Sequence, residues 1–158
     1  KKVLRKNCRN TKEIIRYLKE LAPSEMKAFE RSPEGQPVVI KTATDISEQV
    51  EFIRQDLDKM LRDGIEPGKI VILIDSPMAE SAVSKIEQVG RCKLDWMGRT
   101  YRADSRNIQI TNINNFKGLE ADVVFIVSNS DHGEGSDMLE LYTQASRAKL
   151  LLRLFKMG

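Results

Sequence analysis

The chain has 158 residues, of which 41% are hydrophobic and 31% are charged, so it has the composition of a folded domain and not of a disordered segment. Its 26 Lys and Arg residues and 23 Asp and Glu residues leave a formal charge of only +3, which excludes an arm that binds nucleic acid by charge alone. No apolar stretch approaches the ~20 residues that a membrane helix needs. We therefore expect a single domain over residues 1–158 that does not contact a membrane.

The cysteine and histidine content excludes several kinds of metal site. Cys8 and Cys92 cannot form a CxxC pair or a four-ligand zinc site, and His132 is the single histidine. We expect two cytosolic thiols, no metal ligands in this chain and a cytoplasmic protein. Because the chain starts at Lys1 without an initiator methionine, we also expect it to be part of a longer protein.

Two helices and a strand are predicted in the first part of the chain. A helix is expected to begin at Asn10-Thr11-Lys12-Glu13, with Asn10 as its cap and Glu13 reaching back. A polar and mobile loop over residues 31–36 then precedes a short strand at Val38–Ile40. The strongest pattern is a helix over Asp45–Arg62, which begins with the residue types of a capping box.

Strands and helices alternate through the remainder of the chain. Strands are expected at Ile70–Ile74, Ile108–Ile110, Val123–Val127 and Leu150–Phe155, and helices from Ser76 to Gly90 and from about Asp137 to Arg147. This alternation predicts an α/β domain with a mainly parallel sheet and helices on both faces. Ligands of such sheets sit beyond the carboxyl ends of the strands, so residues that follow strands are the first candidates for a site.

Two common kinds of active site are excluded. The sequence contains no GxxxxGK[ST] loop, so this chain cannot cradle a nucleoside triphosphate by itself. His132 has no GxSxG motif as a partner, and the serines near it fit loop or capping positions. Nucleophilic catalysis is therefore not expected.

Three segments together resemble a known family. They are Leu4–Thr11 before the first helix, Ile110–Ile126 around Lys117-Gly118-Leu119-Glu120, and Leu141–Lys149 in the last helix. In this order and spacing they are similar to motifs IV, V and VI of superfamily 1 helicases, most closely those of the UvrD/Rep type. In that family the corresponding stretches are like NYRST, T-x-H-x-x-KGLE-F-x-VV and LxYVAxTRA.

The resemblance implies that the chain is the second RecA-like (P-loop NTPase-type) motor domain of an ATP-dependent DNA helicase, inactive alone. ATP and Mg²⁺ would be held mainly by an N-terminal RecA-like domain of the same protein. The family's motif IV and VI arginines, here Arg9 and Arg147, reach the γ-phosphate, where a planar guanidinium can contact two oxygens. Glu120 corresponds to a contact with the nucleotide sugar, and Gly118 would let the backbone approach closely there.

Motif V also implies contacts with single-stranded DNA. Asn112 and Asn114 stand where the family has a hydroxyl and a histidine, and an asparagine can still donate to a phosphate oxygen. Phe116 precedes Lys117 inside the motif and could stack on a base. Ala121 and Cys8 depart from the family pattern, because each stands where an aromatic residue is usual.

Each motif has a purely structural alternative. Asn10 and Thr11 can cap a helix, Lys117-Gly118-Leu119-Glu120 can form a turn, Arg147 can face a helix macrodipole, and Phe116 can lie in the core. For the whole chain the alternatives are a non-catalytic nucleic-acid-binding or regulatory module of the same fold, or an RNA-acting helicase. The presence of both arginines favours the motor, since a plain binding module does not need them.

Overall fold

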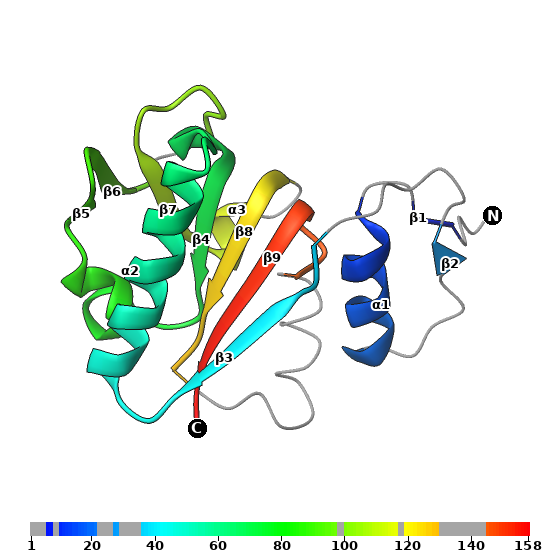
Figure 1. Cartoon of the computed structure of the whole chain (residues 1–158), viewed down its shortest axis with the longest axis horizontal. Coiled ribbons are helices and arrows are strands. Elements are labelled where there is room, and N and C mark those ends of the chain that lie inside the picture. Colours follow the sequence, from blue (N-terminus) through cyan, green and yellow to red (C-terminus); the bar gives the residue numbers. More distant parts are fainter. Residues whose placement is uncertain are drawn as a thin grey trace.

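The computed structural model of the chain describes residues 6–7, 10–21, 27–28, 36–97, 100–116, 119–129 and 145–158. Its centre is a seven-stranded sheet in the order β3-β9-β8-β4-β7-β6-β5 (Figure 1). These strands are β3 (Val39–Ala43), β4 (Ile70–Ile74), β5 (Gln88–Val89), β6 (Cys92–Trp96), β7 (Ile108–Asn112), β8 (Ala121–Val127) and β9 (Ala148–Met157). Neighbouring strands are parallel except β5 and β6, so the sheet is mixed and mainly parallel.

Two shorter features complete the backbone description. β1 (Lys6–Asn7) and β2 (Lys27–Ala28) form a separate two-stranded parallel pair. The 3₁₀ turn η1 (Pro67–Lys69) leads into β4. In the part of the chain described above, no helix combines the length and the apolar character that crossing a bilayer demands.

One face of the sheet is covered by α2 (Ile46–Arg62). Its side chains Ile53, Leu57 and Met60 pack with Ile70, Ile72 and Ile74 of β4. The predicted capping residues begin this helix: the Asp45 side chain accepts a hydrogen bond from the Glu48 N–H at 2.8 Å. Glu48 in turn accepts from the Thr44 N–H at 2.6 Å, so the returning bond of the capping box is displaced by one residue.

The opposite face is covered by α1 (Lys12–Leu21) and the short α3 (Ile113–Phe116). Ile14 and Leu18 of α1 and Phe116 of α3 belong to one cluster with Val71 and Leu73 of β4. Because β4 is covered on both faces, every one of its side chains is buried. The predicted arrangement of helices on both faces of the sheet is therefore confirmed.

The predicted helix between Ser76 and Gly90 is wrong. Two 3₁₀ turns, η2 (Met78–Glu80) and η3 (Ala82–Lys85), are followed by β5 and a turn at Gly90 with φ +59° into β6. The Ser81 hydroxyl accepts from the Val83 N–H at 3.3 Å, and the Ser84 hydroxyl donates to the Ser81 carbonyl at 2.8 Å. Such local bonds compete with a continuous helix. The sequence patterns also gave no indication of β6.

Two other predictions fall mainly outside the described residues. These are the polar loop at 31–36, of which Gln36 is described, and the last helix from about Asp137, of which the described part begins at Ala145.

Candidate functional site

Three segments that are far apart in the sequence meet where β8 and β9 begin. Ala121 lies opposite Ala148 in the pairing of the two strands, and the Ala121 N–H donates to the Arg147 carbonyl at 3.1 Å. The Thr11 N–H donates to the Lys149 carbonyl at 3.2 Å. Figure 1 shows α1 beside the end of the sheet at which β9 starts. The segments that resemble motifs IV, V and VI are thus joined by backbone hydrogen bonds.

Asn10 is buried at this junction, with 1% of its surface exposed. Its side-chain Nδ2 donates to the carbonyl oxygen of Ser146 at 3.2 Å and also to that of Ala148. The predicted role of Asn10 as the cap of α1 is wrong. Thr11 lies in that position instead, with its Oγ1 facing the Ile14 N–H at 3.5 Å.

Arg147 is partly buried at the same junction. Its Nε is buried without a hydrogen-bond partner. Among the described acidic residues, none forms an ion pair with its guanidinium. A buried donor without an acceptor costs about 1–3 kcal/mol. An acceptor brought to this point would therefore satisfy the Arg147 Nε.

Glu120 lies beside Arg147, one residue before β8. Its carboxylate is 3.6 Å from the Lys149 Nζ, and the two side chains are 36% and 42% exposed. Exposed pairs of this kind are weak. The structure thus brings Glu120 and Arg147 together. Arg9 and Gly118 lie outside the described residues.

The residues predicted to contact nucleic acid are placed differently. Asn112 is the last residue of β7, at the carboxyl end of the parallel sheet, and its Oδ1 accepts from the Asn115 N–H at 3.1 Å. Asn114 follows within α3. In a parallel sheet the carboxyl end of β7 and the amino ends of β8 and β9 lie at opposite edges. The predicted nucleic-acid residues and Arg147 are therefore on opposite edges of the sheet.

Phe116 is a core residue in this structure. Its side chain is fully buried, and its ring meets that of Tyr101 edge to face, with centroids 5.5 Å apart and an interplanar angle of 81°. A fully buried ring has no free face for a base, so the predicted stacking role of Phe116 is wrong for this conformation. The structural alternative for this residue holds.

Among the described candidates, Asn112 ends β7 and Asn114 follows it, as expected for site residues of such a sheet. Glu120 and Arg147 precede β8 and β9 instead, at the amino edge. The sequence pattern predicts the strands, but it does not show which end of the sheet forms a binding site. That depends on which end another domain covers.

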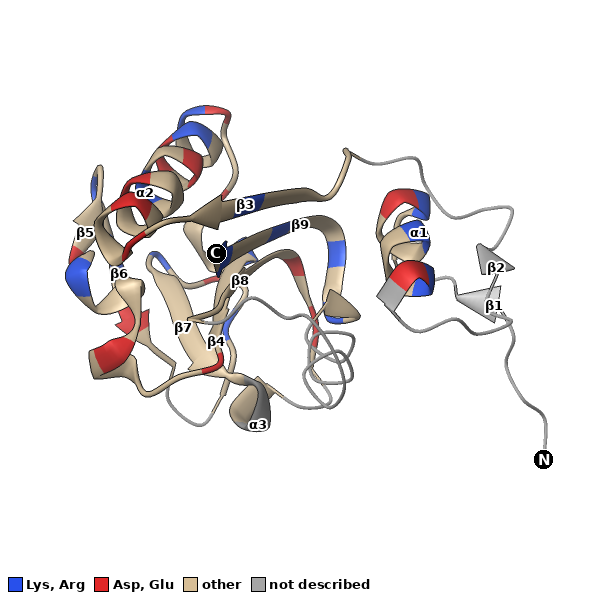
Figure 2. Ribbon diagram, turned by 90° about the horizontal axis from the view of Figure 1, so that it is seen from below, with Lys and Arg blue, Asp and Glu red and all other residues tan. Residues whose placement is uncertain are grey.

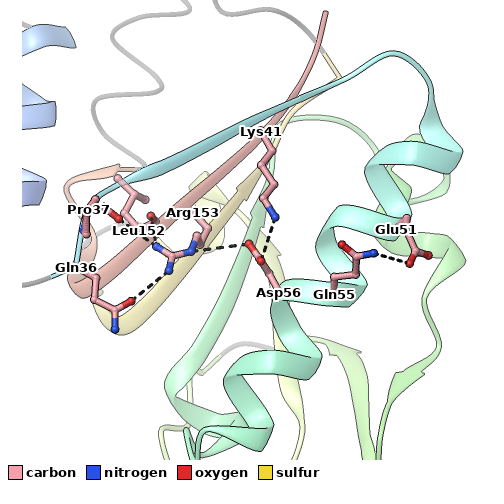
Figure 3. Close-up of polar contacts among 8 residues, drawn as sticks. All are labelled: Gln36, Pro37, Lys41, Glu51, Gln55, Asp56, Leu152 and Arg153. Carbon is pink, nitrogen blue, oxygen red and sulfur yellow. Dashed lines mark hydrogen bonds and ion pairs between the residues drawn. The ribbon is translucent and has the colours of Figure 1, made fainter.

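A second polar cluster lies on the α2 face and lines a pocket of about 440 Å³. Asp56 of α2 is its centre: one carboxylate oxygen accepts from the Lys41 Nζ at 3.2 Å, and the other lies 3.8 Å from the Arg153 Nε (Figure 3). The Arg153 guanidinium also donates to the carbonyls of Pro37 and Leu152, both at 3.3 Å, and to the Gln36 Oε1 at 3.4 Å.

Most groups of this cluster are paired within the domain, although the Asp56 Oδ2 that lies 3.8 Å from Arg153 is buried and accepts no hydrogen bond. Burial lowers the pKa of Arg153 and the neighbouring Asp56 opposes that shift, so the guanidinium remains charged and paired. Its contacts join α2, β9 and the residues before β3. Arg153 is thus a structural arginine, in contrast to Arg147, whose Nε has no partner. Arg153 follows the apolar run Leu150–Leu152, and of these two arginines the family resemblance singles out Arg147 alone.

Among the residues that the structure describes, no group of three or more His, Cys, Asp or Glu side chains is placed to hold a metal ion.

Comparisons with known proteins find a likeness among solved structures. No protein-family model matches the chain, and no curated protein matches it. Among solved structures, the C-terminal domain of a possible DNA helicase from Lactobacillus plantarum WCFS1 is similar, with a TM-score of 0.68 and 20% sequence identity over 95% of this chain and 87% of that chain. The chain therefore shares its fold with the C-terminal domain of a possible DNA helicase.

Proposed function

We propose that this chain is the second, RecA-like motor domain of an ATP-dependent superfamily 1 DNA helicase of the UvrD/Rep type. The observation that carries the proposal is the meeting of the motif IV, V and VI segments where β8 and β9 begin. The structural neighbour, itself described as a possible DNA helicase domain, supports the same general class.

In this proposal ATP and Mg²⁺ are held mainly by an N-terminal RecA-like domain that faces the Arg147 edge of the sheet. The bound nucleotide supplies the phosphoryl group that is transferred to water. Arg147 and Arg9 stabilise the negative charge that develops on the γ-phosphate oxygens. The lack of a partner for the Arg147 Nε supports this role, because a phosphate oxygen would satisfy it. Glu120 accepts from a sugar hydroxyl, and Gly118 allows the close approach.

The opposite edge of the sheet is proposed to carry part of the single-strand track. Asn112 and Asn114 would donate to phosphate oxygens there. In this proposal the nucleotide and the single-stranded DNA contact opposite edges of one rigid sheet. Closure of the interdomain cleft around ATP would therefore also move the edge that contacts the DNA. This arrangement supports stepping along single-stranded DNA.

The test uses the protein that carries this domain together with its N-terminal motor domain. Arg147→Ala is expected to lower kcat for DNA-stimulated ATP hydrolysis by about 10³-fold or more, since arginines in this role contribute 10³–10⁵ in rate. Arg147→Lys should recover little of the lost activity, because an ammonium group lacks the planar pair of N–H donors with which a guanidinium contacts two phosphate oxygens. Arg62→Ala is the matched control: its side chain is 74% exposed and pairs with Asp58.

The outcomes separate the candidate functions. If Arg147→Ala keeps kcat within about twofold of the parent, the assignment of Arg147 fails. If the parent protein binds nucleic acid but hydrolyses no ATP, the non-catalytic module is the better description. Stimulation by RNA and not by DNA would identify the RNA-acting alternative.

A further inference from the structure

Asn10 holds both carbonyl groups that flank Arg147. Its Nδ2 donates to the carbonyl of Ser146, the residue before Arg147, and to that of Ala148, the residue after it. The carbonyl of Arg147 itself accepts from the Ala121 N–H at 3.1 Å. The backbone on both sides of the arginine is therefore fixed to two other segments of the chain.

This anchoring matters because an arginine side chain is long and has several rotatable bonds. A guanidinium can be held to the position that phosphoryl transfer requires only if its Cα is fixed. A misplacement of about 1 Å in such a site can cost about 10²-fold in rate. The hydrogen bonds of the buried Asn10 amide reach the backbone on both sides of Arg147 and not its guanidinium.

We propose that Asn10 is a positioning residue, which fixes the backbone of Arg147 and so aims its guanidinium at the γ-phosphate. This inference rests on the proposed function of Arg147. It adds a role for a residue that the sequence pattern had placed only as a helix cap.

The fold provides a matched control in Gln49 of α2. The Gln49 side chain is also fully buried, and its Nε2 donates to the carbonyls of Ser128 at 2.9 Å and Phe155 at 3.2 Å. Gln49 therefore also holds two backbone carbonyls with one amide, but at the carboxyl ends of β8 and β9, far from Arg147. Loss of either amide removes comparable hydrogen bonds, and only Asn10 lies next to Arg147.

The first measurement is amide hydrogen exchange on the 158-residue chain, which needs no nucleotide. In Asn10→Ala the Ala121 N–H, which donates to the Arg147 carbonyl, is expected to exchange at least tenfold faster than in the parent, beyond the change in global stability. In Gln49→Ala, the exchange rate of the Ala121 N–H should change only as much as the change in global stability predicts. Unchanged exchange at Ala121 in Asn10→Ala would overturn the proposed anchoring. Asn10→Asp, which keeps the shape but loses the donor, provides a second variant if Asn10→Ala does not fold.

The second measurement is ATP hydrolysis by the two-domain protein. Asn10→Ala is expected to lower kcat about 10- to 100-fold with KM for ATP within about threefold of the parent, whereas Gln49→Ala leaves kcat unchanged. Because Asn10 acts through Arg147, adding Asn10→Ala to Arg147→Ala should cause no further fall. An additional fall of the same size in the double variant, or an equal loss of kcat in Gln49→Ala, would reject the positioning role. If Arg147→Ala itself has no effect while Ala121 exchange still responds to Asn10→Ala, the proposed function fails and the anchoring stands.

Discussion

Tyr101 connects two parts of the molecule through its hydroxyl and its ring. The hydroxyl donates to the Gly68 carbonyl at 2.8 Å, and the ring packs edge to face against Phe116. Burial, and secondarily the charge of Asp122, raises the pKa of Tyr101 to about 12. The phenol is therefore held in its neutral form in the folded protein.

This pKa predicts a loss of stability at alkaline pH. The folded pKa of about 12 lies above the value of ~10 in the unfolded chain, so the stabilisation is complete below pH 10 and is lost as the pH rises towards 12. Tyr17, whose pKa burial also raises to about 12, contributes to the same fall. Urea unfolding in Tyr101→Phe should show about 1 kcal/mol less stability at pH 8 and a shallower decline from pH 10 to 12. An identical decline in parent and variant would contradict the assignment.

The cluster around Asp56 predicts a second effect at the scale of single residues. Asp56→Ala leaves Lys41 and Arg153 without their carboxylate, and the Arg153 side chain is only 12% exposed. Removing one partner of a buried charge pair is costly, so the free energy of unfolding should fall by about 1–3 kcal/mol. Asp58→Ala on the same helix is the control, since the Asp58–Arg62 pair is 47% and 74% exposed and should contribute less than about 0.5 kcal/mol. Equal losses in the two variants would show that the Asp56 cluster is not stabilising.

Among the elements, η1 is held by a close backbone contact at Gly68. A Cβ added there would lie 2.5 Å from the Ala103 carbonyl oxygen and 2.6 Å from that of Ser105. Neither backbone group can move without displacing the turn that places Tyr101. A glycine is therefore required at this position because any side chain would clash with the backbone. The φ angle of Gly68, which is not in the left-handed region, does not require glycine.

Gly68→Ala is accordingly expected to lower the free energy of unfolding by about 1–3 kcal/mol, the usual cost of overpacking. Gly64→Ala separates crowding from backbone strain, because Gly64 has φ +93° but no atom within 4 Å of an added Cβ. Displaced amide signals at residues 101–105 should appear in Gly68→Ala only. A Gly68→Ala variant as stable as the parent would show that this turn is easily moved.

The elements also show where sequence patterns succeed. β4 and β8 were predicted because a strand covered on both faces needs apolar residues at every position, and such runs are unambiguous. The helix at Ile46–Arg62 was predicted because its apolar period and its capping residues agree. The helix prediction between Ser76 and Gly90 was wrong because serine hydroxyls form hydrogen bonds with nearby backbone groups there. Hydrophobic periodicity does not include this effect.

The site was predictable only in part. The resemblance to helicase motifs selected Arg147 and Glu120, and the structure places them side by side. The hydrogen bonds of Asn10 could not be predicted, because its partners Ser146 and Ala148 are more than a hundred residues away in the sequence. The burial of Phe116 depends on Tyr101 and on β4 and β8, which approach it only in the folded sheet.

At the scale of the whole molecule, charge limits nucleic-acid binding by this chain alone. The formal charge is +3, and Figure 2 shows acidic and basic residues interspersed on both α1 and α2. With about three or four phosphate contacts, the slope of log K against log salt should be about −2 to −3. Fluorescence anisotropy with a labelled single-stranded oligonucleotide measures both affinity and slope. Submicromolar binding at physiological salt would contradict a strand track shared between two domains.

The strand order has a consequence for how the molecule is assembled during synthesis. β9 is made after the other six strands of the sheet, yet it lies between β3 and β8. While the ribosome is producing the first 147 residues, β3 has no partner in the sheet, and Asn10 and Thr11 lack the carbonyls they bind. Strand pairings between residues this distant in sequence form slowly, and the unpaired strand edges are exposed until they form. The edge that bears Arg147 therefore cannot be completed before β9 has been synthesised, and a nascent chain stalled before that point should be a target for chaperones.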